Sequence, residues 1–175
     1  MPFDFVQVPA NSISYVELII VYYVGMIVML EEARVRLSSI KKKVLVSGCF
    51  DVLHIGHIAF LKDASNYGNT LIIALEGDDF IRQVKKREPF HTQLERAQIL
   101  EELRYVDVVV LLPEKYDTYP KMFEAINPTT VVVGTDEPYF SQKKAQIEAV
   151  GGKIISSKIR ITHKSSTNAI RYLKE

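Results

Sequence analysis

The 175-residue sequence contains a single cysteine and carries a formal net charge of only +1. One cysteine cannot form an internal disulfide, and Cys49 lies in an apolar segment that we expect to be buried, so a reducing compartment such as the cytoplasm is the simpler expectation. A balanced charge provides no global attraction for nucleic acid, although local basic clusters occur at 41–43 and 85–87. We therefore expect no nucleic-acid partner, and any polyanion that binds should be small.

The sequence also lacks internal repeats and low-complexity tracts. With 47% apolar residues it is long enough for one well-buried domain and short for two. It shows no evident combination of a nucleophile with a base. A zinc site needs three or more ligands, and four histidines with one thiol at scattered positions do not suggest one, so we predict no dedicated metal site.

A long apolar run at residues 13–30 sets the N-terminal part apart from the rest. As a helix it would span about 27 Å, close to the thickness of a bilayer core, and the basic residues after it would keep the following domain in the cytoplasm. A cleaved signal peptide is disfavoured, because no basic stretch precedes the run and no small-residue cleavage site follows it. Three interpretations stay open: a membrane or interfacial segment, an element that packs on the domain or on a subunit partner, or a start assigned too early, with Met26 or Met29 as the first residue. We treat 1–40 as an apolar extension and 41–175 as the main domain.

From Lys42 onward, short Val- and Ile-rich runs alternate with segments of helical periodicity. We predict strands within 43–48, 69–77, 106–113, 129–135 and 153–157, and helices over 57–67, 78–84, 92–103, 119–126, 141–150 and about 165–173. Thr92 and Glu95 form a capping box, and Gly68 is a candidate helix C-cap. Strands that are apolar throughout need cover on both faces. The pattern therefore predicts an α/β fold, a Rossmann-like, doubly wound, five-stranded parallel sheet with helices on both faces.

Ligands of such sheets bind at the carboxyl ends of the strands, where the stretches 48–57, 134–140 and 160–167 fall. His54 and His57 lie three residues apart at the start of a helix, so both side chains can face the crevice. A metal site, two structural histidines and a phosphate site are the possible interpretations. The phosphate site fits best, because Gly56 allows close backbone approach and a helix N-terminus offers free N–H groups and partial positive charge.

The string SGCFDVLHIGH, together with HKSSTNAI near the end, resembles the nucleotidyltransferase superfamily marked by an HxGH motif and an Ile/Val-Ser-Ser/Thr-Thr motif, in its cytidylyltransferase-like branch. The likeness covers residues 42–175 and implies that 41–175 is a nucleotidyltransferase domain. It implies that a phosphorylated small-molecule acceptor attacks the α-phosphorus of a nucleoside triphosphate in line and releases pyrophosphate without a covalent enzyme intermediate. Such catalysis depends on positioning and charge neutralisation. The resemblance also implies Mg²⁺, bound mainly through substrate phosphates, and a homodimer.

The resemblance assigns roles to individual residues. Those expected to act on the reacting phosphates are His54, His57, Lys86 and Thr167. Those expected to bind the nucleotide are Gly48, Cys49, Phe50, Asp51, Gly56, Lys85, Arg96, Asp136, Arg160, Ser165 and Ser166. An exposed basic loop without a ligand is the alternative for the two lysines. His163 and Lys164 depart from the family pattern just before the Ser-Ser-Thr signature.

Two features of the sequence indicate different substrates. GCFDVLHIGH and VGGKII are closest to the adenylyltransferase of heptose 1-phosphate, which makes an activated sugar for surface polysaccharide, whereas RYVD, the double lysine and Arg160 are closer to enzymes that cytidylylate glycerol phosphate or ethanolamine phosphate. An FAD synthase that adenylates FMN and a nucleotide-binding module without turnover are further alternatives. We expect ATP, with CTP as the alternative, and a sugar or polyol phosphate as acceptor.

Overall fold

The computed structural model describes residues 26–113, 119–135, 137, 140–149 and 151–159. Six strands form one sheet in the order β1-β4-β3-β2-β5-β6, and every neighbouring pair is parallel. Parallel neighbours need crossover connections, which helices supply. The strands are β1 (Met26–Met29), β2 (Lys43–Gly48), β3 (Thr70–Leu75), β4 (Val108–Leu111), β5 (Thr130–Val133) and β6 (Lys153–Ser156).

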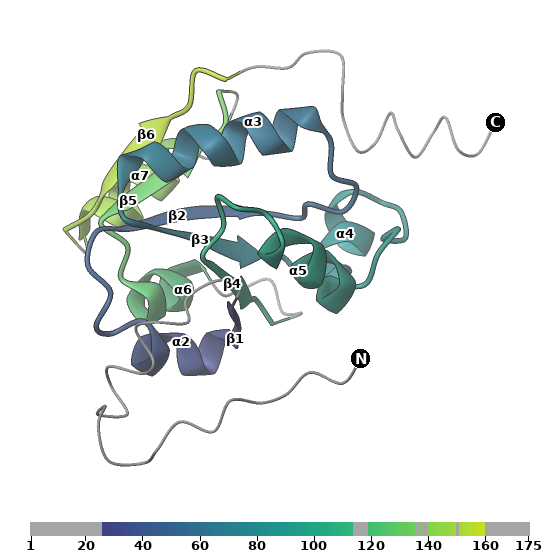
Figure 1. Cartoon of the computed structure of the whole chain (residues 1–175), viewed down its shortest axis with the longest axis horizontal. Coiled ribbons are helices and arrows are strands. Elements are labelled where there is room, and N and C mark those ends of the chain that lie inside the picture. Colours follow the sequence, from purple (N-terminus) through teal and green to yellow (C-terminus); the bar gives the residue numbers. More distant parts are fainter. Residues whose placement is uncertain (1–25, 114–118, 136, 138–139, 150, 160–175) are drawn as a thin grey trace, which may run out of the picture.

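Helices cover both faces of this sheet (Figure 1). They are α2 (Leu30–Arg36), α3 (Ile55–Ala64), α4 (Asp78–Val84), α5 (Gln93–Glu101), α6 (Tyr119–Ile126) and α7 (Phe140–Ala149), with a 3-10 turn, η1 (Ser65–Tyr67), after α3. Buried side chains of α3 and α5 join one apolar layer, and those of α2, α6 and α7 join the layer on the opposite face. The predicted Rossmann-like α/β fold class is therefore confirmed.

Successive residues of β2 show why the strands are apolar without interruption. Val44 and Val46 pack in the layer of α3 and α5, whereas Leu45 packs in the layer of α2, α6 and α7. All three are fully buried. Because side chains alternate across a strand, a strand covered on both faces needs an apolar residue at every position.

The sheet has six strands and not the predicted five, because β1 comes from the end of the long apolar run. Met26–Met29 pairs with Val108–Leu111 of β4, and α2 then buries Leu30 and Ala33 in the layer that it shares with α6. Residues 26–29 are thus an edge strand of the sheet and not part of a helix over 13–30. Residues 13–25 lie outside the described residues. Within the part of the chain that is described, no helix is long and apolar enough to span a membrane.

Most predicted elements are confirmed, and two local predictions were wrong. Helix α3 begins at Ile55, two residues before the predicted start, because His54 caps it. Gly68 is not a left-handed C-cap, since its backbone is extended (φ −169°). A Cβ there would lie 2.3 Å from the carbonyl oxygen of Lys42, so this glycine is needed for the close approach of two chain segments. The predicted helix at 165–173 lies outside the described residues.

The order of the strands reverses between β2 and β5. The chain proceeds from β2 to β3 and β4 on one side, and later to β5 and β6 on the other. Open α/β sheets bind ligands beside the carboxyl ends of the strands at such a switch point. The segment that leaves β2 at this point leads directly to His54 and His57.

Candidate active site

The chain leaves β2 through a tight turn that begins at Gly48. Phe50 adopts a left-handed backbone conformation (φ 46°), which residues other than glycine rarely take, and its ring is buried against Gly48. A Cβ on Gly48 would lie 3.0 Å from that ring, so a larger residue would push the ring aside. Strained backbone of this kind concentrates at functional sites. The turn brings the backbone of residues 48–51 to the carboxyl edge of the sheet.

His54 is the N-cap of α3. Its backbone is extended (φ −142°, ψ 169°), and its Nδ1 accepts a hydrogen bond from the Gly56 N–H at 3.1 Å. Its carbonyl oxygen accepts from the His57 N–H at 2.9 Å. Because Nδ1 is an acceptor, neutral His54 carries its proton on Nε2. His54 therefore starts the helix and keeps a second nitrogen that can donate to a ligand.

The rings of His54 and His57 stack, with centroids 3.8 Å apart and planes 21° apart. The Phe50 ring meets the His57 ring edge-on at 5.2 Å. Burial, with a smaller contribution from the nearby His54, lowers the pKa of His57 to about 4. Burial also lowers the pKa of His54. Both imidazoles are therefore neutral at pH 7 in the absence of a ligand, and they meet an anion as hydrogen-bond donors.

The Nδ1 atom of His57 is buried and has no hydrogen-bond partner in the described part of the chain. Leaving a buried polar atom unpaired costs about 1–3 kcal/mol in typical proteins. Such atoms are uncommon and often mark a functional position. The histidine pair thus combines a helix N-terminus, stacked neutral rings and an unpaired polar atom at the switch point.

Asp51 fastens the loop at residues 85–91 to the turn after β2. Its buried carboxylate accepts hydrogen bonds from the Arg87 guanidinium and from the backbone N–H groups of Phe90 (2.9 Å) and His91 (3.1 Å). The side chain of the predicted nucleotide ligand Asp51 is thus directed to this loop, while its backbone remains in the turn. In the sequence, Arg87 stands out only as part of a basic cluster, because its partner lies 36 residues earlier.

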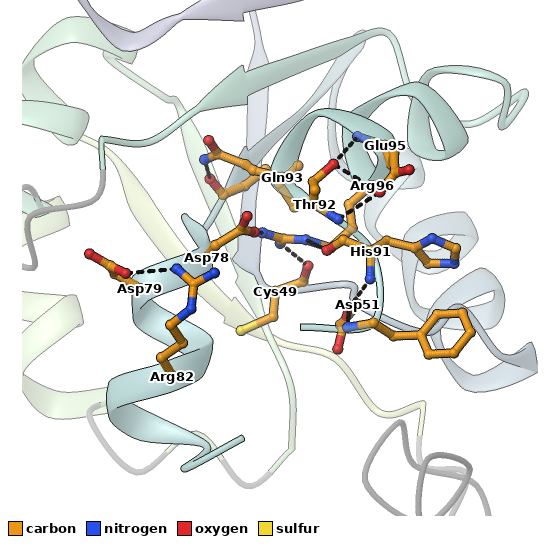
Figure 2. Close-up of polar contacts among 12 residues, drawn as sticks. Cys49, Asp51, Asp78, Asp79, Arg82, His91, Thr92, Gln93, Glu95 and Arg96 are labelled. Carbon is orange, nitrogen blue, oxygen red and sulfur yellow. Dashed lines mark hydrogen bonds and ion pairs between the residues drawn. The ribbon is translucent and has the colours of Figure 1, made fainter. Parts of the chain in front are cut away.

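Arg96 joins three segments from a fully buried position (Figure 2). Its guanidinium donates to the carbonyl oxygens of Cys49 (2.5 Å) and His91 (3.2 Å), and to the carboxylate of Asp78 (2.7 Å) at the start of α4. Because its exposed fraction is 0%, the structure does not bring Arg96 to a surface where it could contact a phosphate. The sequence-based assignment of Arg96 as a nucleotide ligand is therefore replaced by a structural role.

The two predicted phosphate-binding lysines lie where α4 ends. Both Lys85 and Lys86 are exposed, and Lys86 has a left-handed backbone (φ 54°). Lys85 lies close enough to Cys49 for its charge to lower the pKa of that thiol, although burial, with a further contribution from Glu76, raises the pKa to about 11. The Cys49 thiol is therefore protonated at neutral pH. The two lysines lie in the loop that the Asp51 carboxylate binds.

A second polar group lies at the end of β3. The backbone N–H of Glu76 donates to the carbonyl oxygen of Gly48 at 3.1 Å, and its carboxylate accepts from the Tyr119 hydroxyl at 2.6 Å. Lys143 Nζ lies 5.5 Å from the centre of the Tyr119 ring and 3.1 Å from the Glu137 carboxylate. These four side chains come from the residue after β3, from α6, from α7 and from the segment before α7.

Burial raises the pKa of Glu76, while the Tyr119 hydroxyl and the charges of Lys143 and Arg96 act in the opposite direction. Glu76 and Tyr119 were not predicted from the sequence. Neither residue belongs to a recognisable motif, and only the packing of α6 against the sheet brings them together. Their local sequence offers no signal that could have predicted the pair.

Five predicted site residues lie outside the described residues: Asp136, Arg160, Ser165, Ser166 and Thr167. Their roles stay predictions. Ser157, near the end of the described chain, donates from its hydroxyl to the Asp63 carboxylate of α3 at 2.6 Å, and the Ile159 N–H donates to the Ser157 hydroxyl at 3.1 Å. The last described residues thus lie beside the helix that carries the histidine pair.

Comparison with known proteins places this geometry in a family. Residues 45–171 match the family described as cytidylyltransferase-like. The FAD synthase of Thermococcus kodakarensis is 36% identical over 124 residues, which cover 70% of this chain and 81% of that protein. The bifunctional protein HldE of Geobacter metallireducens is 37% identical over 116 residues, which cover 65% of this chain and 23% of that protein. The chain therefore spans about a quarter of the length of that relative.

The solved structures include one with a similar fold. The crystal structure of the lipopolysaccharide core biosynthesis protein from Thermoplasma volcanium GSS1 matches with a TM-score of 0.61 at 25% identity, over 68% of this chain and 98% of that chain. The family match begins in β2 and includes the turn after it, both histidines and the loop at 85–91. The chain therefore belongs to the cytidylyltransferase-like family.

Proposed function

We propose that this nucleotidyltransferase transfers an adenylyl group from ATP to a sugar phosphate or polyol phosphate and releases pyrophosphate. The proposal depends mainly on one observation, the stacking of His54 and His57 at the N-terminus of α3, beside the strand switch point. Neutral imidazoles and helix N–H groups supply several donors in a small space. Such an arrangement suits the oxygens of a phosphate chain.

In the proposed reaction, an oxygen of the acceptor phosphate bonds to the α-phosphorus of ATP. The bond between that phosphorus and the oxygen bridging to the β-phosphate breaks, and its electron pair leaves with pyrophosphate. His54 and His57 donate to the oxygens on which negative charge grows. Preorganised donors of this kind contribute about 10²–10³ each to the rate. Cys49 supplies no nucleophile, because its thiol stays protonated at neutral pH.

The remaining predicted ligands complete the proposed site. Lys85 and Lys86 would neutralise the outer phosphates from the loop that Asp51 holds. Gly48 and Gly56 would let the backbone approach the nucleotide. The predicted ligands Asp136, Arg160, Ser165, Ser166 and Thr167 stay part of this proposal.

Mg²⁺ enters this proposal as part of the substrate, bound to the triphosphate. Among the residues described here, no group of three or more His, Cys, Asp or Glu side chains could hold a metal ion. Mg²⁺ usually keeps phosphate and water ligands when it accompanies a nucleotide. The ion would offset the charge of the phosphates while the acceptor attacks.

A second acceptor, FMN, is favoured by one specific comparison. The chain covers 81% of the T. kodakarensis FAD synthase, so the likeness extends over most of that protein. FAD contains an adenylyl group, so this relative also supports ATP over CTP as donor. CTP with glycerol phosphate or ethanolamine phosphate is the remaining alternative.

The proposal is tested by measuring pyrophosphate release with ATP or CTP and a panel of acceptors. The panel contains heptose 1-phosphate, glycerol 3-phosphate, ethanolamine phosphate and FMN, and mass spectrometry identifies each product. We expect turnover with ATP and a sugar or polyol phosphate, and a fall of about 10²–10³ in kcat for His57→Ala. The control is Lys62→Ala, an exposed change on the same helix. No release with any pair would refute the proposed activity, and turnover with CTP alone would overturn the choice of nucleotide.

A further inference from the structure

Glu76 and Tyr119 form a polar pair on the same edge of the sheet as the histidines, one strand away. Glu76 directly follows β3, and its N–H is bonded to Gly48, where the turn toward His54 begins. Its charge also contributes to the high pKa of the Cys49 thiol, so the carboxylate lies near that side chain. The pair is thus next to the phosphate-binding turn but separate from the histidines.

We propose that Glu76 and Tyr119 determine acceptor specificity by binding hydroxyl groups on the sugar or polyol part of the acceptor. This inference rests on the proposed function. A carboxylate repels phosphate, so this pair does not suit the triphosphate itself. It does suit a neighbouring group that donates hydrogen bonds.

The hydrogen bonds that Glu76 can accept favour the sugar or polyol substrate over the nucleobase. Oε1 of Glu76 accepts from Tyr119, and no hydrogen bond to Oε2 is formed within the described part of the chain. An ionised carboxylate can accept several hydrogen bonds. A sugar or polyol offers several hydroxyl donors, whereas adenine offers one amino group beside ring nitrogens that are acceptors. A row of hydroxyls therefore matches Glu76 better than the base does.

The surrounding charges favour a neutral group over an ammonium group. The charges of Lys143 and Arg96 and the hydroxyl of Tyr119 already stabilise the Glu76 carboxylate. Lys143 also lies over the Tyr119 ring and is itself paired with Glu137. Another cation would be repelled by Lys143 and Arg96. It also could not take the position over the Tyr119 ring, which Lys143 occupies. Ethanolamine phosphate is therefore disfavoured, while polyols, sugars and the ribityl chain of FMN are compatible.

Lys143 and Glu137 act as positioning residues in this arrangement. Their side chains are only 13% and 17% exposed, so their ion pair is shielded from solvent. The ammonium group 5.5 Å from the ring centre restrains Tyr119 at the first turn of α6. The Tyr119 hydroxyl is thereby held at 2.6 Å from Glu76.

The test compares Glu76→Gln and Tyr119→Phe with the parent protein. We expect the KM for glycerol 3-phosphate and heptose 1-phosphate to rise about tenfold to a hundredfold in Glu76→Gln, and less in Tyr119→Phe. The KM for ATP should stay within about twofold, since the triphosphate and base do not contact the pair. The matched control is Glu124→Gln, an exposed carboxylate on α6 that pairs with Arg34. If Glu76→Gln does not fold, Tyr119→Phe, which removes a single hydroxyl, decides the question.

A binding measurement separates this inference from the proposed function. Calorimetric titration of glycerol 3-phosphate into protein loaded with a non-hydrolysable ATP analogue does not depend on turnover. Weaker binding in Glu76→Gln supports the inference even if the parent protein releases no pyrophosphate. The inference is overturned if glycerol 3-phosphate binds Glu76→Gln as tightly as the parent protein, or does not bind the parent protein. It is also overturned if the KM for ATP rises equally, or if the KM for ethanolamine phosphate rises as much as that for the sugar and polyol phosphates.

Discussion

Arg96 donates from Nη1 to the carbonyl oxygen of Cys49 at 2.5 Å, although 47 residues separate the two in the sequence. The same guanidinium binds Asp78 and the carbonyl oxygen of His91. The turn after β2, the start of α4 and the loop before α5 are therefore held by one buried side chain. Because the histidine pair follows this turn directly, its placement depends on a contact made by a residue outside the pair.

Replacing Arg96 by leucine should lower the free energy of unfolding by about 3–5 kcal/mol, because the Asp78 carboxylate would lose its buried counter-ion. Two carbonyl oxygens would also lose a donor. Arg96→Lys should lie between the parent and Arg96→Leu, since lysine keeps the charge but cannot form the same three bonds. Chemical denaturation of the parent protein and the two variants measures their free energies of unfolding.

The matched control for Arg96 is Arg82→Leu. Arg82 is also paired with two carboxylates, Asp79 and Glu88, but its side chain is 44% exposed. Ion pairs in contact with water contribute little to stability. Equal losses for the two leucine variants would contradict the structural role of Arg96.

Asp51→Asn should loosen the loop at residues 85–91. Asparagine has one acceptor oxygen in place of two, so the Arg87 guanidinium and the N–H groups of Phe90 and His91 cannot all keep their partners. Both amides donate to Oδ1, so the NH₂ group of asparagine falls opposite Arg87 and the ion pair is lost. The loop is then less firmly held, and hydrogen exchange at Phe90 and His91 should become about tenfold faster. Asp79→Asn is the control and should leave these amides unchanged, because the Asp79 side chain is 44% exposed and bonds to Arg82.

The stability of the protein should fall in acid because of His57. Its pKa is about 4 in the folded protein, against an ordinary value of 6.5. Between these values the unfolded chain binds a proton that the folded chain does not, so lowering the pH favours unfolding. The contribution should reach about 3 kcal/mol near pH 4 and vanish above pH 7.

Urea unfolding of the parent protein and of His57→Gln between pH 4.5 and 7.5 measures this effect. The stability difference between them should shift in favour of the variant as the pH falls, since glutamine does not titrate. An NMR titration gives the direct check, in which the His57 ring should stay neutral at pH 5.5. A midpoint near 6.5 would show that the ring is not buried as the structure has it.

Gly68→Ala should destabilise the fold by about 1–3 kcal/mol through overpacking. The new Cβ would lie 2.3 Å from the Lys42 carbonyl oxygen and 2.6 Å from a methyl group of Val44, and a backbone atom cannot move aside cheaply. Gly134→Ala is the control, because nothing lies within 4 Å of a Cβ at that position. It should be neutral or slightly stabilising. Thermal unfolding of Gly68→Ala and Gly134→Ala measures the difference between their stabilities.

Features encoded within a few residues could be predicted from the sequence. The apolar runs predicted β2 to β6, because a strand covered on both faces needs apolar side chains throughout. Thr92 and Glu95 predicted a helix start, and the structure contains both reciprocal bonds of the capping box. The spacing of His54 and His57 predicted that both would lie at a helix start, and they lie at the N-terminus of α3, whereas the stacking of their rings was not predicted.

The sequence could not predict which distant groups would become partners. The apolar residues 26–29 suit either a membrane helix or a strand, and only pairing with β4 decided between these possibilities. Arg96 resembles any basic residue on an amphipathic helix until the fold buries it against Cys49 and Asp78. The composition and local pattern of this chain determined strands β2 to β6, its helix starts and the placement of its two histidines at a helix start, because these depend on neighbours in sequence. The tertiary structure alone decided the roles of Asp51, Arg96 and Glu76, because a buried polar group takes the partner that the packing of the sheet and helices brings to it.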